Sequence, residues 1–487
     1  MKLLLFIVTA IASSTYTAGA DDNHLALVRR YADALIENGT DTYGEEHSGM
    51  LLSMMNRDTL RPFDKMPKGP SGVRNADRVT PHGSNVNLDQ NLYRVLYLLS
   101  EITGDTKYRD AADAALTKFL KATPSPKTKL FAWGEHLCWD LKKDGWASND
   151  NRSTHEPKRP TILFEKLLAL NPKAMIGYCD GLWEHQIQDH KTGNFSRHAD
   201  YTRHAPGKDW DFPKEGGYFI HDWAQAWQKT RESRFLDHID VLASRFLRKL
   251  GKTRHKLIEF DSRRGYASTV SSLSLVLDSH KAAQLVGDAP VRDRLEQLTA
   301  SIDQGLLALP HELVSKGFVQ CVTVEDDYQL YQPEKNGGYT STWAMKYGRK
   351  PTAMYGILCH ARSQQLRDGD VADQYRELAL QAARKYLTSE PNMADRPWPL
   401  ELGMAIFLQL AAHESTGDSK FLERARHFAA LAKAAYWSDG NPLPKADPKC
   451  DHYENATRAD TLALALLKLH VIENKLPVKI GISDIDR

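Results

Sequence analysis

The sequence has few cysteines, no strong excess of charge of either sign and only one long apolar run. Its five cysteines among 487 residues are an odd number and contain no C-x-x-C pair, which excludes a zinc ribbon and a disulfide-dense scaffold. Lys and Arg number 64 against 62 Asp and Glu, so bulk electrostatics give no reason to expect nucleic-acid binding. An ordinary globular protein remains, and either one disulfide or five buried thiols would fit the cysteine count.

The one long apolar run lies at the N-terminus. Lys2 precedes the stretch Leu3 to Ala12, and small residues follow up to Ala18-Gly19-Ala20, which is the pattern of a secretory signal peptide. The run is too short to cross a bilayer. We therefore predict that residues 1–20 are a cleaved signal peptide and that residues 21–487 form one soluble domain, secreted or periplasmic, without membrane insertion.

Long Val/Ile/Thr alternation of the kind that predicts a large sheet is also missing. What recurs instead is a short joint between two helical runs: Thr103 to Tyr108 reads TGDTKY and Thr416 to Phe421 reads TGDSKF, with looser copies at 230–235, 286–288 and 368–370. In such a joint Gly ends one helix in the left-handed conformation, and Asp caps the next helix. The recurrence indicates a repeat protein whose unit is a pair of helices.

The two helices of each predicted pair differ in character. The first is apolar nearly all round and the second has a charged face, which indicates an inner and an outer layer. Leu25 to Ile36 would be the outer partner of the last inner helix and would close a ring. We predict an all-α (α/α)7 toroid as a single catalytic domain over residues 21–487, with six pairs as the alternative; the inner helices are expected near 86–102, 173–188, 217–229, 267–286, 351–366, 399–415 and 457–470.

Most Gly, Pro, Trp, His and Arg residues fall in the long connections that lead from an outer helix to the next inner helix. These loops should open on one rim, where binding residues usually lie, beside helix N-termini that favour anions. Capping or packing is the competing interpretation for each cluster taken alone. The residues that we expect to bind substrate are Asn87, Trp133, Glu135, His136, Arg197, His198, Arg203, Tyr218, Arg264, Arg349 and Trp398.

A metal site is an alternative use of one of these clusters. His136, His155 and Glu156, with Arg159 nearby, could supply imidazole and carboxylate ligands, but their spacing matches no established zinc motif. We therefore predict no metal ligand and no required cofactor, with calcium or another divalent cation as the alternative.

Arg, His, Tyr, Asn and Trp at one rim suit an acidic polysaccharide, because aromatic rings stack on sugars and Arg binds carboxylates. Such a site favours β-elimination of a uronic-acid glycoside, in which the carboxylate is neutralised and a base removes the C5 proton. The first alternative is a glycoside hydrolase of acidic oligosaccharides, which needs two carboxylates across the bond. The second is a non-catalytic carbohydrate-binding protein. Candidate carboxylates for hydrolysis are Glu135, Asp140, Glu215, Asp222, Glu401 and Asp460.

The layout resembles exported toroid polysaccharide lyases that act on polyuronates. Tyr218 and His221 near one helix start, followed by Arg264-Gly265-Tyr266 before the next, are similar to the catalytic His/Tyr pairs of these enzymes. The glucuronan and alginate lyases of polysaccharide lyase family 38 are the nearest resemblance. It implies His221 as the base and Tyr266 as the acid, on a substrate such as glucuronan, alginate or pectate.

Other assignments stay open at this stage. His198 or His204 could replace His221 as the base, and Tyr218 or Tyr339 could replace Tyr266 as the acid. Toroid pectate lyases, a second resemblance, use a metal and an arginine base, which would give His136 or His155 with Arg159 the larger role. In either case we expect a monomer whose partner is an acidic polysaccharide.

Overall fold

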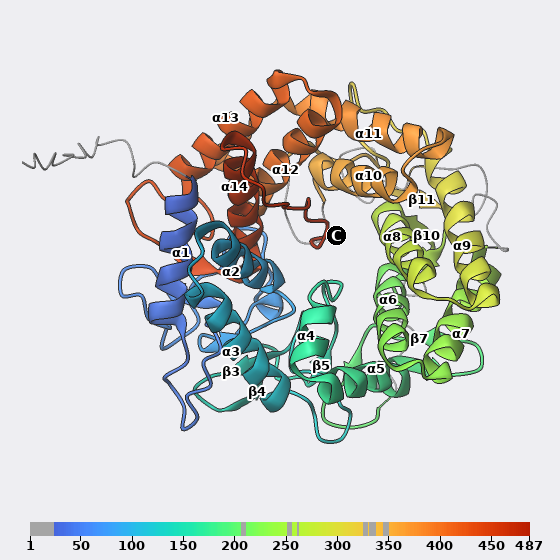
Figure 1. The fold of residues 1–487 in the computed structure, drawn as a ribbon, viewed down its shortest axis with the longest axis horizontal. Coiled ribbons are helices and arrows are strands. Elements are labelled where there is room, and N and C mark those ends of the chain that lie inside the picture. Colours follow the sequence, from blue (N-terminus) through green and yellow to red (C-terminus); the bar gives the residue numbers. More distant parts are fainter. Residues whose placement is uncertain are drawn as a thin grey trace, which may run out of the picture.

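The computed structural model describes residues 24–205, 211–250, 256–260, 263–324, 330, 338–343 and 350–487, except for the side chains of 260, 263 and 264. In this part of the chain the helices form a ring of two layers (Figure 1). The predicted signal peptide lies outside the described residues. The all-α toroid predicted from the sequence is confirmed.

Seven helices of the described chain line the inside of the ring, and each is preceded or followed by an outer helix (Figure 1). Inner helices that are apolar on all sides are buried in the core. In α12, for example, every residue from Pro399 to Ala412 is buried. The inner helices are α2 (Gln90–Thr103), α4 (Phe164–Leu170), α6 (Pro213–Thr230), α8 (Thr269–Leu285), α10 (Thr352–Leu366), α12 (Pro399–Thr416) and α14 (Ala459–Glu473).

The outer helices bury one face and expose the other. In α13, for example, Phe421, Ala425 and Phe428 are buried at helical spacing while charged residues lie between them. The outer helices are α1 (His24–Gly39), α3 (Lys107–Ala122), α5 (Pro172–Gln186), α7 (Ser233–Leu250), α9 (Ala289–Leu307), α11 (Asp370–Tyr386) and α13 (Ser419–Tyr436).

The sequence led to the wrong layer for one helix, which was predicted as an inner helix and is an outer one. The segment predicted at 173–188 is α5, which lies farther from the centre of the ring than the short helix α4 (Figure 1). Its buried residues, among them Met175, Tyr178 and Leu182, mark a single face. The prediction missed α4 because its seven residues are too few to show a helical period.

The recurring joints have the geometry that their residues predict. Gly104 ends α2 with φ of 74° and Gly417 ends α12 with φ of 71°, the left-handed conformation that only glycine adopts without strain. The carboxylates of Asp105 and Asp418 accept hydrogen bonds of 3.0 Å from the main-chain N–H groups two residues later. Both strong copies therefore reverse the chain between an inner and an outer helix.

The ring closes between its first and last helices. The hydroxyls of Tyr31 in α1 and Tyr453 lie 3.1 Å apart, and His24 of α1 lies 3.8 Å from Glu473 of α14. On the other side of α14, the Asn91 amide of α2 donates to the Thr461 hydroxyl over 2.9 Å. The predicted packing of the N-terminal helix near the last inner helix is confirmed.

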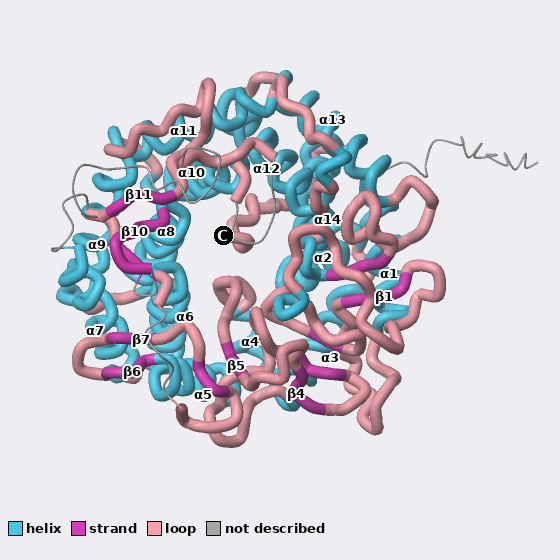
Figure 2. The backbone as a smooth tube through the Cα atoms, turned by 180° about the vertical axis from the view of Figure 1, so that it is seen from behind, coloured by secondary structure: helices cyan, strands magenta, loops and turns pink. Residues whose placement is uncertain are grey.

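Short antiparallel strands cross the long connections on the face nearest the viewer in Figure 2. They pair as β1–β12, β2–β3–β4, β5–β8, β6–β7 and β9–β10–β11. Their bounds are β1 (Met54–Asn56), β2 (Gly83–Ser84), β3 (Cys138–Asp140), β4 (Gly145–Ala147), β5 (Thr154–His155), β6 (Ile187–Asp189), β7 (Asn194–Phe195), β8 (Ala199–Asp200), β9 (Glu259–Phe260), β10 (Arg263–Ser268), β11 (Cys321–Thr323) and β12 (His452–Glu454).

The segment after α14 turns into the ring, where the C-terminus lies (Figure 1). Asp486 accepts a 2.7 Å hydrogen bond from the Thr461 hydroxyl of α14. Arg487 donates over 2.5 Å to Asp278 of α8, and its guanidinium lies 5.8 Å from the ring centroid of Tyr218 in α6. The segment thus connects inner helices from opposite parts of the chain.

Two further expectations concerned membrane insertion and the pairing of the cysteines. None of the helices described is long and apolar enough to cross a membrane. All five cysteines are described and no two of them form a disulfide, so the alternative of one disulfide is not realised.

Candidate active site

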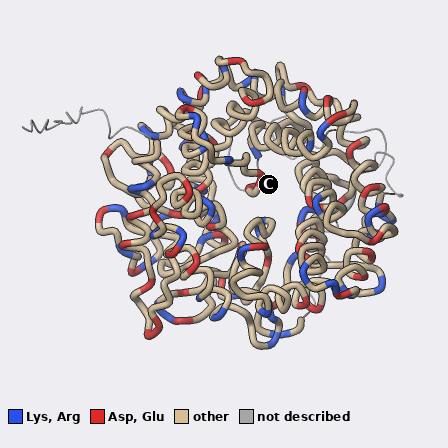
Figure 3. The backbone as a smooth tube through the Cα atoms, viewed as in Figure 1, with Lys and Arg blue, Asp and Glu red and all other residues tan. Residues whose placement is uncertain are grey.

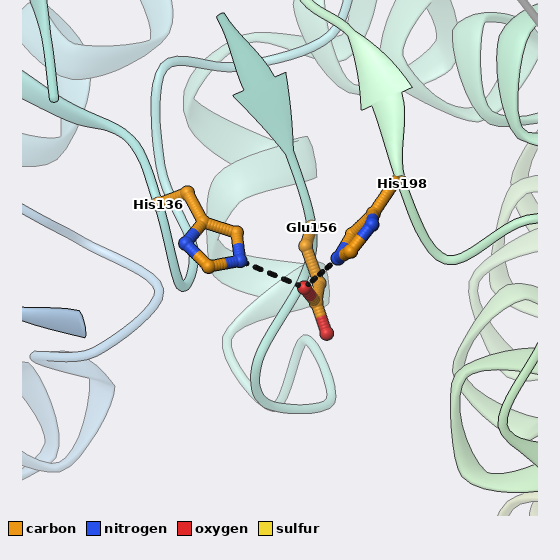
Figure 4. Close-up of side chains that lie close together, drawn as sticks. All are labelled: His136, Glu156 and His198. Carbon is orange, nitrogen blue, oxygen red and sulfur yellow. Dashed lines mark hydrogen bonds and ion pairs between the residues drawn. The ribbon is translucent and has the colours of Figure 1, made fainter. Parts of the chain in front are cut away.

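Three side chains with metal-binding chemistry, those of His136, Glu156 and His198, point toward one another (Figure 4). The Nε2 atoms of His136 and His198 lie 3.3 Å and 2.6 Å from the same carboxylate oxygen of Glu156. One ligand atom from each residue falls within 4.8 Å of the others. We call these residues the His–Glu–His cluster.

Strand pairing explains why Glu156 meets His198. In the β5–β8 ladder Thr154 faces Asp200 and His155 faces Ala199. The same register continued by one residue places Glu156 opposite His198. Two segments more than 40 residues apart thereby contribute neighbouring side chains, with Glu156 buried and His198 about one quarter exposed (26%).

His136 reaches the cluster because its loop lies against the end of β5. Gly134 forms a bridge to Glu156, and the N–H of Glu135 donates to the Glu156 carbonyl over 2.9 Å. Gly134 has φ of 102°, and a Cβ atom there would overlap the Glu156 carbonyl group. The buried Asn85 amide fixes the same loop, since it donates to the carbonyls of Gly134 and Leu137 over 2.8 and 2.9 Å.

Arg197 contacts the cluster from the residue before His198. Its Nε donates to the second carboxylate oxygen of Glu156 over 2.8 Å, and its guanidinium lies 4.1 Å from the ring centroid of Phe212. Burial acts to raise the pKa of Glu156, but the hydrogen bonds of both histidines and the charge of Arg197 hold this pKa well below its usual value. The carboxylate is therefore anionic and ready to bind a cation.

A second carboxylate beside the cluster is also paired with cations. Glu135 is 2.5 Å from the Lys158 ammonium and 3.2 Å from Arg74. Burial acts to raise its pKa, but the charge of Lys158 holds it below the ordinary value. The loop that carries Lys158 is fixed by Asn87, whose amide oxygen accepts the N–H groups of Lys158 and Arg159 over 3.1 and 3.2 Å.

A third carboxylate, Glu215 in the first turn of α6, is fully buried. Neither of its oxygens has a hydrogen-bond partner among the described residues, although the Lys214 ammonium lies 3.4 Å away. Burial is the main reason that its pKa rises to about 7. A buried acid of this kind is typical of a functional site.

The cluster fits a divalent transition metal better than calcium. Two imidazole nitrogens and one carboxylate are the donors of zinc, manganese, nickel and iron sites, whereas calcium takes oxygen ligands. The geometry also fits a metal site, because the Nε2 atoms of both histidines lie against one carboxylate oxygen of Glu156. A cation bound between the three side chains would replace these direct contacts. From the sequence, His136 and Glu156 were named as ligands only in an alternative metal site with His155, and His198 was not assigned to it.

The structure brings four of the predicted substrate-binding residues together: Glu135, His136, Arg197 and His198. Trp133 lies elsewhere, fully buried and stacked on Phe119 with centroids 5.4 Å apart. Asn87 is also fully buried and its amide binds main-chain groups.

Several other candidates lie in connections outside the His–Glu–His cluster. The side chain of Arg203 is 73% exposed and pairs with Asp200. The Nδ1 atom of His204 lies 3.0 Å from the Nδ1 atom of His185. The Trp398 indole donates over 2.7 Å to the Ser71 carbonyl.

The predicted base, His221, and the predicted acid, Tyr266, lie in a helix and a strand respectively. His221 lies in α6, which begins at Pro213 and not at Gly217 as predicted, so it is in the third turn of the helix. Burial and the charges of Lys281 and Arg487 lower its pKa to about 3.

Tyr266 is half-buried in β10, opposite Thr323 of β11 and not in a helix. Of the alternative acids, Tyr218 is buried in α6 and the Tyr339 hydroxyl donates to the Pro310 carbonyl over 3.2 Å. Arg349 and the Arg264 side chain lie outside the described residues.

Comparison with known proteins points to the same part of the chain. The sequence model of a family described as periplasmic pectate lyase matches residues 69–244, which include the whole His–Glu–His cluster. A pectate disaccharide-lyase of Dickeya dadantii (strain 3937) is 31% identical over 121 residues, which are 25% of this chain. The match spans only 22% of that relative's length.

Solved structures with a similar course of the chain share little sequence with it. A D-mannose isomerase is 8% identical with a TM-score of 0.47, covering 93% of this chain and 100% of its own. The α-mannanase BT2949 of Bacteroides thetaiotaomicron, of glycoside hydrolase family 76, is 10% identical with a TM-score of 0.46, covering 94% and 98%.

Proposed function

We propose that this protein is a polysaccharide lyase that cleaves an acidic polysaccharide by β-elimination, with pectate as the favoured substrate. The observation that carries the proposal is the His–Glu–His cluster with Arg197 at its edge, inside the segment that matches the periplasmic pectate lyase family. The same match supports action in the periplasm or outside the cell. Glucuronan and alginate are the other candidate substrates.

The chemistry requires a weakly acidic C5 proton to be removed beside a carboxylate. His136, Glu156 and His198 would hold a divalent cation, which when bound neutralises the uronate carboxylate and makes the developing negative charge tolerable. Arg197 contacts the cluster, and we assign to its guanidinium nitrogens the removal of the C5 proton. The electron pair of the C5–H bond then forms the double bond between C4 and C5 as the glycosidic C4–O bond breaks, and the leaving oxygen takes a proton from solvent. Phe212 supports this guanidinium from the face of the ring.

To act as a base, Arg197 needs a lower pKa than it has while Glu156 binds no metal and its full negative charge acts on the guanidinium. Burial acts to lower the pKa of Arg197, but the charges of Glu156 and Glu215 keep it above the usual value. Engagement of Glu156 as a ligand would take that partner away, and a protonated Glu215 would remove the second negative charge. Both changes move Arg197 in the direction that a base requires. His221 and Tyr266 stay the alternative base and acid.

The proposal is tested by mixing the purified protein with pectate, alginate, glucuronan and a neutral glucan. Elimination forms a conjugated double bond, so we expect ultraviolet absorbance to rise with a polyuronate and not with the glucan. A chelator should stop the rise, and manganese, nickel or zinc should restore it better than calcium. New reducing ends without the absorbance would identify a hydrolase, and binding without either signal would identify a carbohydrate-binding protein.

A further inference from the structure

Trp146 is the only exposed Phe, Trp or Tyr side chain in the part of the chain that the structure describes. It lies in β4 and is 39% exposed. Lys and Arg are interspersed with Asp and Glu around the ring (Figure 3), so charge alone marks no path for a substrate beyond the His–Glu–His cluster. An exposed indole can mark such a path by a different chemistry, since its large flat ring is apolar.

Trp146 lies close to both histidines of the cluster. In the β3–β4 ladder it pairs directly with Trp139, which follows His136 by three positions. Three residues span at most about 11 Å and paired Cα atoms are about 5 Å apart, so the Cα atoms of Trp146 and His136 lie within about 16 Å of each other. The Trp146 ring also lies 6.1 Å from the ring of Tyr201, three positions after His198. A polymer bound at the cluster can therefore extend to Trp146.

The hairpin that carries Trp146 is fixed by hydrogen bonds at its turn. The buried carboxylate of Asp140 accepts the main-chain N–H groups two and three residues later over 3.1 and 3.2 Å. The carboxylate of Asp144 accepts the N–H groups of Glu45 and Glu46 over 2.8 and 3.2 Å, which ties the turn to a separate loop. An aromatic ring on a fixed support binds a ligand with little loss of conformational entropy.

The charges around Trp146 are of both signs. Lys142 and Lys143 in the turn of the hairpin are exposed, and so are Glu45 and Glu46 in the loop that contacts it. Such a mixed surface does not select carboxylates, whereas the indole offers a flat apolar face. The C–H groups on the face of a pyranose ring are the complementary surface, because the hydroxyl groups of a sugar project mainly from its edge.

We propose that Trp146 stacks on a sugar ring of the polysaccharide, on a unit other than the one that is cleaved. This inference rests on the proposed polysaccharide substrate and deepens it from a reacting sugar to a longer bound chain. Tyr201, which is only 5% exposed, supports the indole from the protein side with its ring plane tilted by 57°. Because the contact is with the face of the sugar ring, it is indifferent to the charge of the sugar's carboxyl group.

The test is calorimetric binding of polygalacturonate and of partly methyl-esterified pectin, with a chelator present so that the polymers stay intact. For Trp146→Ala we expect the dissociation constant of both polymers to rise about fivefold, as for the loss of one aromatic stacking contact, with the melting temperature nearly unchanged. Trp146→Phe should retain most of the affinity, because a phenyl ring keeps a stacking face. Val371→Ala is the matched control, since Val371 is 38% exposed but lies on the outer helix α11.

Trp146→Gln provides a second variant should Trp146→Ala fail to fold, and the same rise is expected. An unchanged dissociation constant, an equal rise in Val371→Ala, or weaker binding of polygalacturonate alone would overturn the inference. The two proposals fail separately. Weaker binding by Trp146→Ala in a protein that shows no elimination supports the Trp146 contact and rejects the lyase, whereas elimination by the wild-type protein with unchanged binding by Trp146→Ala rejects the contact alone.

Discussion

Replacing Gly134 with Ala should disable the site through the backbone alone. Gly134 lies in the loop that carries Glu135 and His136, and its φ of 102° is unfavourable for any residue with a side chain. A Cβ atom would lie 2.8 Å from the carbonyl carbon of Glu156 and closer still to its oxygen. Neither atom belongs to a flexible side chain that could move away.

The size of the effect follows from these distances. Ordinary contact begins at 3.4 Å, so the carbonyl carbon of Glu156 alone would have to move by about 0.6 Å and the closer carbonyl oxygen by more than about 1 Å. Metal ligands tolerate about 0.2 Å, and a misplacement of about 1 Å can cost about 100-fold in rate. We expect metal affinity to fall clearly and elimination to fall by about 100-fold, with about 1–3 kcal/mol lost from the free energy of unfolding.

The assay is elimination on polygalacturonate at increasing metal concentration, with calorimetric metal binding on the same preparations. Two controls separate the causes. Gly145→Ala lies in β4, where the nearest atom would be 3.7 Å from the new Cβ, and Gly49→Ala has φ of 72° but nothing within 4 Å. Wild-type metal affinity and activity in Gly134→Ala would refute the reasoning.

Three further outcomes are expected. Arg197→Lys should lower kcat by at least about 100-fold because lysine cannot keep the guanidinium contacts with Glu156 and Phe212, whereas Arg152→Lys, 76% exposed, should not. Burial acts to raise the pKa of Asp484, but the charge of Arg487 holds this pKa at about 2. The stabilisation that Asp484 contributes should therefore be complete above about pH 4 and be lost as pH falls toward about 2. In urea unfolding, Asp484→Asn should lower the free energy of unfolding by about 2 kcal/mol at neutral pH. Gly417→Ala should cost about 1 kcal/mol of thermal stability, since its φ is 71° and no atom lies within 4 Å.

The toroid could be predicted because its signals are local. A glycine that ends one helix and an aspartate that starts the next act within six residues, as at Thr103 to Tyr108. Apolar residues all round α12 and on one face of α13 are visible as helical periods. The misplaced helix α5 shows the limit: a helix of intermediate character can be assigned to a layer only when its partner, here the short α4, is known.

The site could be predicted only in part, because its members meet through long-range pairing. His136, Arg197 and His198 were recognised by residue type as substrate-binding residues, and His136 and Glu156 also as ligands of an alternative metal site. Glu156 joins them through β5 and β8, strands of two residues each that carry no period of their own. The amides of Asn85 and Asn87 likewise act on loops 49 to 72 positions away, and nothing in the local sequence distinguishes such amides from helix caps.

Elimination and hydrolysis make opposite demands on the carboxylates of a site. A hydrolase needs one carboxyl group kept protonated as the acid and a second kept free as base or nucleophile across the bond. Glu156 is bound by two histidines and an arginine, and Glu135 by Lys158 and Arg74. That leaves Glu215 as a protonatable acid without a free partner at the cluster. A lyase instead needs cations around the sugar's own carboxylate. Under the proposed function a metal held by the cluster, together with Arg197, would supply them, so this distribution of charge supports the elimination proposed above.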